Sequence, residues 1–261
     1  MDNFFVYGSG LGFMFFKWIH FLAGITWIGV LYYFNFIQGE WFKEIEDQTK
    51  GKAVRTLVPR ALWWFGWGAM FTFLSGVIML GMKYHGGATS NTLQTYDLYI
   101  FIGALLGTLM FLNVWVIIWP ARKIVIASSE SVANGGEADP RAATSLASAG
   151  LASRTNTLFS IPMLFFMGAA RNLHAPTPPP LEAGVAAPTN EMMTAAALAL
   201  QQNQHIAIWI IVTVILLLEA NSLFGKMGPM ASVAGVIHCG LLLTLILILP
   251  IYYLCGFISF V

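Results

Sequence analysis

The chain has 261 residues, of which 57% are hydrophobic and only 10% are charged. A typical soluble domain has about 25% charged residues, so this composition excludes a water-soluble catalytic domain. The formal net charge of +1 offers no basic surface for nucleic acid. A lipid bilayer accepts this much apolar surface, and we therefore expect a multi-pass protein of the bacterial inner (cytoplasmic) membrane.

Long uncharged runs, of about 18 residues or more, predict membrane-spanning helices. We expect helices at residues 11–38, 61–82, 98–120, 140–172, 205–225 and 229–258. The sequence therefore predicts an all-α bundle of about six transmembrane helices, which forms a single transmembrane domain over residues 1–261. The connecting stretches 128–150 and 175–188 are rich in Ala, Ser, Gly or Pro, which is typical of flexible or extended segments.

Lysine and arginine indicate how the bundle is oriented. Ten of them share one side of the expected topology: Lys43, Lys50, Lys52, Arg55, Arg60, Arg122, Lys123, Arg141, Arg154 and Lys226. Only Lys17, Lys83 and Arg171 fall on the other side. The positive-inside rule places the larger group in the cytoplasm, so we expect both termini on the outer side.

His20 is the first residue that could carry chemistry, because a polar group within a membrane helix is costly and tends to be functional. Gly24 and Trp27 follow it on the same helical face. A small residue one turn from a histidine leaves space for a flat ligand, and imidazole is an axial ligand of haem. We therefore predict a b-type haem site at His20, Gly24 and Trp27. The alternative is a histidine bonded to a carbonyl group or to water.

The other four histidines are candidate partners of His20 or candidate metal ligands. His238 lies in the sixth expected helix and His205 opens the fifth, so either could complete a haem site. His238 is expected in the inner half of the membrane, however, and His20 in the outer half. His85, His174 and His205 are expected at the outer side, where with His20 they could bind copper or a second haem. The alternative is that they are solvated loop residues.

Three further polar residues lie in or beside expected spans. Glu219 is costly in a membrane unless it is paired or protonated, so it could carry protons, pair with a nearby cation or lie at the inner interface. Arg154 and Asn156 precede the apolar part of the fourth helix. Pro162 then removes one backbone hydrogen bond and is expected to kink that helix. The freed carbonyl groups could line a cavity, or the kink could serve packing alone.

Two segments carry a family resemblance. Residues 18–29 read W-I-H-F-L-A-G-I-T-W-I-G, and residues 153–167 read S-R-T-N-T-L-F-S-I-P-M-L-F-F-M. The first resembles the W-x-H-x-x-A-x-I-x-W-I-G opening helix of the bacterial cytochrome-c-linked urate oxidase (urate hydroxylase) family. The second resembles the R-x-N-x-x-x-S-x-P-x-L-F-x-M segment of the N-terminal membrane domain of the same family. A weaker likeness, to small membrane haem proteins, does not include the second segment.

The resemblance implies a membrane oxidoreductase that oxidises urate and passes electrons toward a cytochrome c. It draws attention to His20, Trp27, Arg154, Asn156 and Pro162. The chain has no C-x-x-C-H motif, so we expect no covalent haem c and no cytochrome c domain within it. A separate cytochrome c would supply that electron carrier. The family's S-N-H is replaced by Ala170-Arg-Asn-Leu-His174, which displaces the histidine by two positions.

The sequence thus favours a membrane redox subunit that binds haem b and passes electrons to a separate cytochrome c. A second hypothesis is a non-catalytic accessory subunit of a respiratory complex, which predicts no cofactor and co-purification with a larger assembly. A third is a transporter or metal-handling protein that uses the outer histidines and Glu219.

Overall fold

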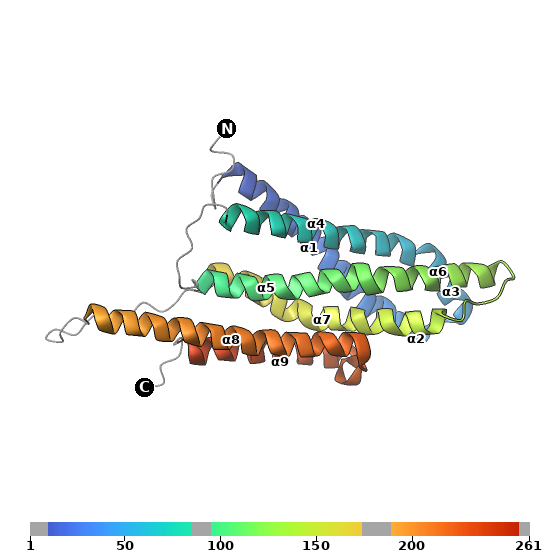
Figure 1. The fold of residues 1–261 in the computed structure, drawn as a ribbon. Coiled ribbons are helices and arrows are strands. Elements are labelled where there is room, and N and C mark those ends of the chain that lie inside the picture. The colour runs from blue at the N-terminus through green and yellow to red at the C-terminus, as the bar shows by residue number, and fades with distance from the viewer. Residues whose placement is uncertain (1–9, 85–94, 174–188, 256–261) are drawn as a thin grey trace.

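The computed structural model describes residues 10–84, 95–173 and 189–255, and every regular element in these ranges is a helix. Six long helical segments run back and forth along one direction, which confirms the predicted all-α polytopic bundle (Figure 1). The first helix begins and the last helix ends at the same end of the bundle (Figure 1). An even number of passes therefore returns the chain to the side from which it started.

Two of the six segments are helices interrupted by π-helical turns. The first consists of α1 (Leu11–Tyr32), η1 (Tyr33–Gln38) and α2 (Gly39–Glu44). The second consists of α5 (Thr95–Leu112), η2 (Asn113–Ile118) and α6 (Trp119–Ala133). The remaining elements are α3 (Asp47–Thr56), α4 (Val58–Tyr84), α7 (Ala142–Asn172), α8 (Asn190–Phe224), the 3-10 turn η3 (Gly228–Ala231) and α9 (Val233–Leu254).

Several helices extend further than the sequence predicts. The connector expected at 128–150 is mostly helical, because α6 continues to Ala133 and α7 begins at Ala142. Its alanines are the strongest helix formers, so the prediction of a flexible connector there is wrong. The fifth span, expected from residue 205, begins at Asn190 as α8, where the Thr189 side chain accepts a hydrogen bond from the Met192 amide. The connector 175–188 lies outside the described residues.

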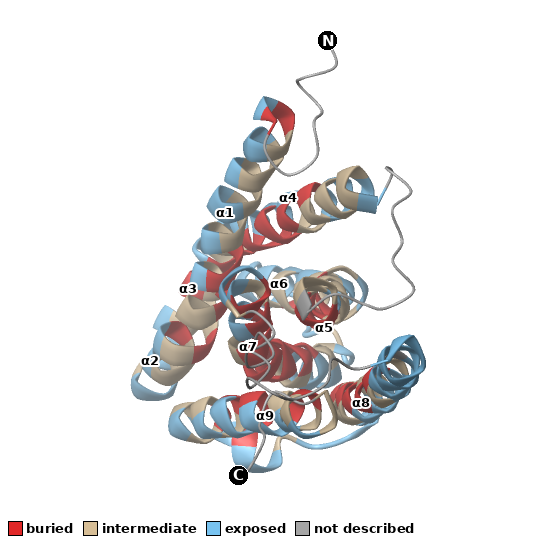
Figure 2. Ribbon diagram, turned by 90° about the vertical axis from the view of Figure 1, so that its left-hand side faces the viewer, coloured by how far each residue is buried: buried red, intermediate tan, exposed pale blue. Residues whose placement is uncertain are grey.

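The helix α7 differs from the other five long segments in its composition. In the described part of the chain, five helices are long and apolar enough to cross a membrane, and α7 is not among them although it has 31 residues. It lies at the centre of the bundle with the other helices around it (Figure 2), and 15 of its residues are buried. A helix that is covered by protein needs no lipid-facing surface, so α7 can place polar side chains deep in the bundle.

A close helix crossing joins α1 to α4. A Cβ atom at Gly68 would lie 3.1 Å from the backbone nitrogen of Trp27 and 3.3 Å from the Ala23 carbonyl oxygen. Small residues at such crossings let two backbones approach and pack. The absence of a side chain at Gly68 therefore determines how closely α4 approaches the helix that carries His20.

Candidate functional site

Six of the buried polar side chains in the described ranges lie on α7, more than on any other element. Four of them, Ser153, Arg154, Asn156 and Ser160, are each less than a tenth exposed, and we call them the α7 polar seam. Side chains from α1, η1, α2 and η2 contact the seam, and α8 joins it through Asn113 of η2. Polar groups in the interior of a membrane bundle are costly and mark functional sites, so the seam is the candidate site.

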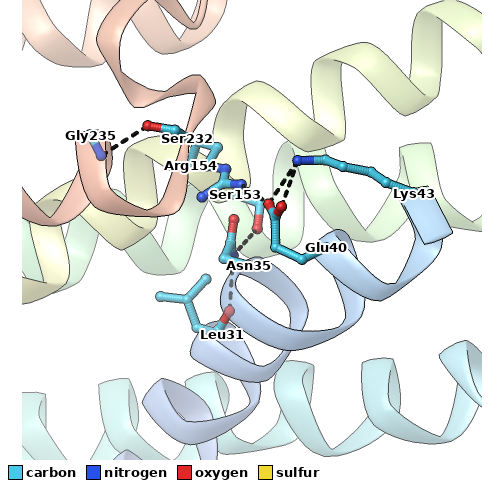
Figure 3. A network of polar contacts seen from close by, with 8 residues as sticks. All are labelled: Leu31, Asn35, Glu40, Lys43, Ser153, Arg154, Ser232 and Gly235. Atoms are coloured by element: carbon cyan, nitrogen blue, oxygen red, sulfur yellow. Dashed lines mark hydrogen bonds and ion pairs between the residues drawn. The ribbon is translucent and has the colours of Figure 1, made fainter.

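The first interrupted helix contacts one side of the seam. The Asn35 amide of η1 donates to the Ser153 hydroxyl, at 2.8 Å, and to the Leu31 carbonyl oxygen, at 2.9 Å (Figure 3). One turn earlier, the Tyr32 and Ser160 hydroxyl oxygens are 2.9 Å apart. These contacts hold α1 and η1 against the centre of α7.

The second interrupted helix contacts another side of the seam. The Asn113 amide of η2 donates to the Asn156 side-chain oxygen, at 3.0 Å, and to a Glu219 carboxyl oxygen on α8, at 3.2 Å. The Asn156 amide donates in turn to the Met110 carbonyl oxygen, at 2.9 Å. Asn156 is 0% exposed, so bulk water does not compete for its hydrogen bonds. The three side chains tie α5, α7 and α8 together.

Both interruptions have π-helical geometry, which sequence analysis did not predict. The Gly39 amide bonds to the Phe34 carbonyl, and the Trp119 amide bonds to the Val114 carbonyl, in each case five residues earlier. Such turns occur frequently at functional sites. In each segment a buried asparagine, Asn35 or Asn113, faces α7. An asparagine within a long apolar run is the signal that could have revealed both positions.

Arg154 is the cation of the α7 polar seam, and its guanidinium group is incompletely paired. Its residue exposure is 8%. Its Nη2 atom lies 3.8 Å from the Glu40 carboxylate, beyond hydrogen-bond distance, and its Nη1 atom is buried with no partner in the described part of the chain. Glu40 is engaged by Lys43, whose ammonium lies 2.8 Å from both carboxyl oxygens (Figure 3). The guanidinium therefore keeps an unused donor inside the protein.

Glu219 is partly buried and bonds to the neutral Asn113 amide. Among residues 10–84, 95–173 and 189–255, no ion pair joins it to a lysine or an arginine. Pairing with a nearby cation, one of the three roles considered for Glu219, is therefore not found in these ranges, and Glu219 joins the seam through Asn113.

His20 is held by α4 through one ring nitrogen. Its Nδ1 atom lies 2.8 Å from the Thr72 carbonyl oxygen and 3.2 Å from the Ser75 hydroxyl. A histidine that binds a metal usually donates its other N–H group to such a carbonyl. The arrangement thus leaves Nε2 as the ring nitrogen that is available to a ligand.

The space expected beside His20 is filled by α4. A Cβ atom at Gly24 would lie 3.8 Å from the Thr72 methyl group, so the Gly24 face contacts Thr72 rather than opening into a pocket. Trp27 is 2% exposed and packs in the hydrophobic core. Neither residue lines a space for a flat ligand in this arrangement.

The structure does not bring the predicted histidines together. His20 lies on α1, which packs on α4 and α7, whereas His205 and His238 are exposed on α8 and α9, beyond α7 (Figure 2). His85 and His174 lie outside the described residues. Within the ranges that are described, no group of three or more His, Cys, Asp or Glu residues could hold a metal ion. Among the described histidines, His20 could hold a haem iron through Nε2, and neither His205 nor His238 lies beside it to form a pair.

Comparison with known proteins gives one match. Residues 88–174 match the model of the family described as Urate oxidase N-terminal, so this segment of the chain is similar to that family. The match confirms the resemblance inferred from residues 153–167, while residues 18–29 lie outside it. It includes Asn113, Arg154 and Asn156 of the site just described. Neither the curated proteins nor the solved structures include a match to this chain.

Proposed function

Proceeding from the match to the urate oxidase N-terminal family, we propose that this chain is the membrane component of a urate-oxidase-like oxidoreductase. The match at residues 88–174 carries the proposal, because this segment builds most of the α7 polar seam. Polar side chains are costly inside an apolar bundle and tend to be functional. The presence of Asn113, Arg154 and Asn156 there supports a role in binding or chemistry.

The distribution of charge supports a direction for the reaction. Glu40 is part of α2, and Arg154 lies 3.8 Å from its carboxylate. The helices α2 and α3 lie at one end of the bundle (Figure 1) and carry Lys43, Lys50, Lys52 and Arg55. The positive-inside rule assigns this end to the cytoplasm of a bacterial inner membrane. Substrate would then enter from the cytoplasm, and a separate cytochrome c would accept electrons at the outer end, where α1 begins.

We also propose that His20 binds a b-type haem through Nε2. The haem would supply one-electron transfer. The chain's own contribution is to fix the imidazole, since the Thr72 carbonyl group accepts the Nδ1 proton and so selects the tautomer with a free Nε2. Among the described residues, His20 is the histidine that would hold the haem, because His205 and His238 lie on α8 and α9, beyond α7.

The activity is tested with inner-membrane vesicles that contain the chain. We expect urate to drive the reduction of added ferric cytochrome c, followed by visible absorption. Vesicles from cells without the chain, and vesicles with Arg154→Gln, should lose this urate-dependent rate. If urate reduces cytochrome c no faster in vesicles with the chain than in vesicles without it, the proposed function is wrong.

The haem assignment has its own measurement. We expect the purified wild-type protein to give a Soret band and a pyridine haemochrome, and His20→Ala to lose both because the iron loses its ligand. The matched control is His238→Ala, since His238 is exposed on the opposite side of α7 and its loss should leave the spectrum unchanged. A haem-free wild-type protein, or a His20→Ala variant with its full spectrum, would contradict the assignment.

A non-catalytic accessory subunit is the second candidate function. The Thr72 contact at Gly24 and the separation of His20 from His205 and His238 support it, because in the described residues neither a second histidine nor an open space lies beside His20. This alternative predicts that the protein purifies without haem in a larger respiratory complex. A protein that is stable and haem-loaded when purified alone would exclude it.

A further inference from the structure

We propose that Arg154 is the binding residue for a planar organic anion at the α2 end of the bundle, and that Glu40 occupies this site when the anion is absent. The inference deepens the proposed function, on which it rests, by naming the residue and the substrate class of the same site. Urate is one such anion, a flat heterocycle with oxygen acceptors and ring N–H donors.

The first argument is the incomplete pairing of Arg154. The guanidinium is more than nine-tenths buried, and its Nη1 donor has no partner in the described ranges. A buried charged donor without an acceptor is unfavourable. An anion that accepts hydrogen bonds from both terminal nitrogens would remove this penalty, and the planar guanidinium fork suits a planar anion.

The second argument is a buried acceptor on the facing helix. Gln38 of η1 is 4% exposed, and its side-chain oxygen is buried with no partner among the residues described. It lies one turn beyond Asn35, whose amide bonds to Ser153, the residue before Arg154. An unused donor and an unused acceptor on two facing elements suit a ligand that has both an anionic oxygen and an N–H group.

The third argument is the state of Glu40. Its carboxylate is the closest anion to Arg154, yet the 3.8 Å separation is too long for a hydrogen bond. Lys43 holds both of its oxygens at 2.8 Å, and the Glu40 side chain is 38% exposed. Glu40 can therefore swing away with Lys43, which gives an anion from solution a route to the guanidinium.

Binding is tested without turnover. The purified full chain in detergent is titrated anaerobically with urate, without cytochrome c, by isothermal titration calorimetry, with inorganic phosphate as the comparison ligand. We expect urate to bind and phosphate not to compete. Arg154→Gln should weaken urate binding about tenfold or more, since a charge-assisted pair of hydrogen bonds is lost. Arg154→Lys keeps the positive charge but loses the planar guanidinium group, so its affinity for urate should lie between those of the wild type and Arg154→Gln.

Glu40→Gln gives the decisive result, because it removes the competing charge and leaves Arg154 in place. We expect it to tighten urate binding several-fold, which a variant with damaged folding would not do. Arg141→Gln is the matched control, since Arg141 is an exposed cation near the same end and pairs with Asp139; its affinity should equal that of the wild type. Unchanged or weaker binding by Glu40→Gln, wild-type affinity of Arg154→Gln, or equal binding of phosphate would overturn the inference.

The two levels of the proposal fail separately. Arg154-dependent urate binding without any urate-driven reduction of cytochrome c would leave the anion site standing and refute the oxidoreductase. Urate-driven reduction with an unchanged KM in Arg154→Gln would keep the oxidoreductase and refute the anion site.

Discussion

Replacing Asn156 with alanine should destabilise the bundle by about 2–3 kcal/mol. Asn156 is fully buried, accepts a hydrogen bond from Asn113 and donates one to the Met110 carbonyl group. The substitution removes both contacts at once, so the Asn113 amide and the Met110 carbonyl group each lose a hydrogen-bond partner inside the bundle. Thermal unfolding of the purified protein in detergent should show a clearly lower midpoint. Asn113 also bonds to Glu219, so the position of the Glu219 carboxyl group should become less fixed.

Asn172→Ala is the matched control for this prediction. Asn172 lies on the same helix, but it is exposed and its amide bonds only to the Gly168 carbonyl one turn earlier. Exposed substitutions of this kind usually change stability by no more than about 0.5 kcal/mol. Equal unfolding midpoints for the two variants would show that the Asn113–Asn156 contact does not hold α5 against α7.

Gly68→Leu should have the second large effect, a loss of about 3 kcal/mol. A side chain at Gly68 meets the backbone of α1 at Trp27 and Ala23, and backbone atoms cannot turn aside as a flexible side chain can. The helices α1 and α4 must therefore separate. Because the Thr72 carbonyl oxygen on α4 holds His20, we expect the variant to lose haem together with stability, as measured by thermal unfolding and by the Soret band.

Gly81→Leu tests whether this effect depends on the crossing. Gly81 lies on the same helix, is exposed, and has no atom within 4 Å of the position of its Cβ. Leucine is a better helix former than glycine, so we expect unchanged or slightly higher stability. If Gly68→Leu were as stable as Gly81→Leu, α1 and α4 would not cross as closely as the structure shows.

The sequence predicted those properties that depend on the solvent around each segment. Long apolar runs at residues 61–82 and 98–120 correspond to α4 and to the helix formed by α5, η2 and α6. His20, Arg154 and Asn156 stood out because they are polar residues in such surroundings. The R-x-N segment agreed with the family match, which includes it.

Predictions made from the sequence pattern of a single segment were wrong where neighbouring helices change the surroundings of that segment. The helix at residues 140–172 was predicted as one transmembrane helix among six, but α7 is less apolar than the candidate spans and the other helices cover much of it. The residues 128–150 were predicted to be flexible because Ala, Ser and Gly also occur in linkers, although alanine strongly favours helices. Asn35 and Asn113 lie in the π-helical turns and bond to α7, and no local pattern predicts those contacts.

Composition and periodicity by themselves determined that this is an all-helical membrane protein with a few costly polar groups. Only the tertiary structure decided which of those groups meet: His20 with Thr72, Asn113 with Asn156 and Glu219, and Arg154 with too few partners. The physical reason is that each residue type has its own free energy of transfer from water to lipid, and these free energies add up along the chain. A hydrogen bond requires two groups at a defined distance and angle, and helix packing alone supplies both.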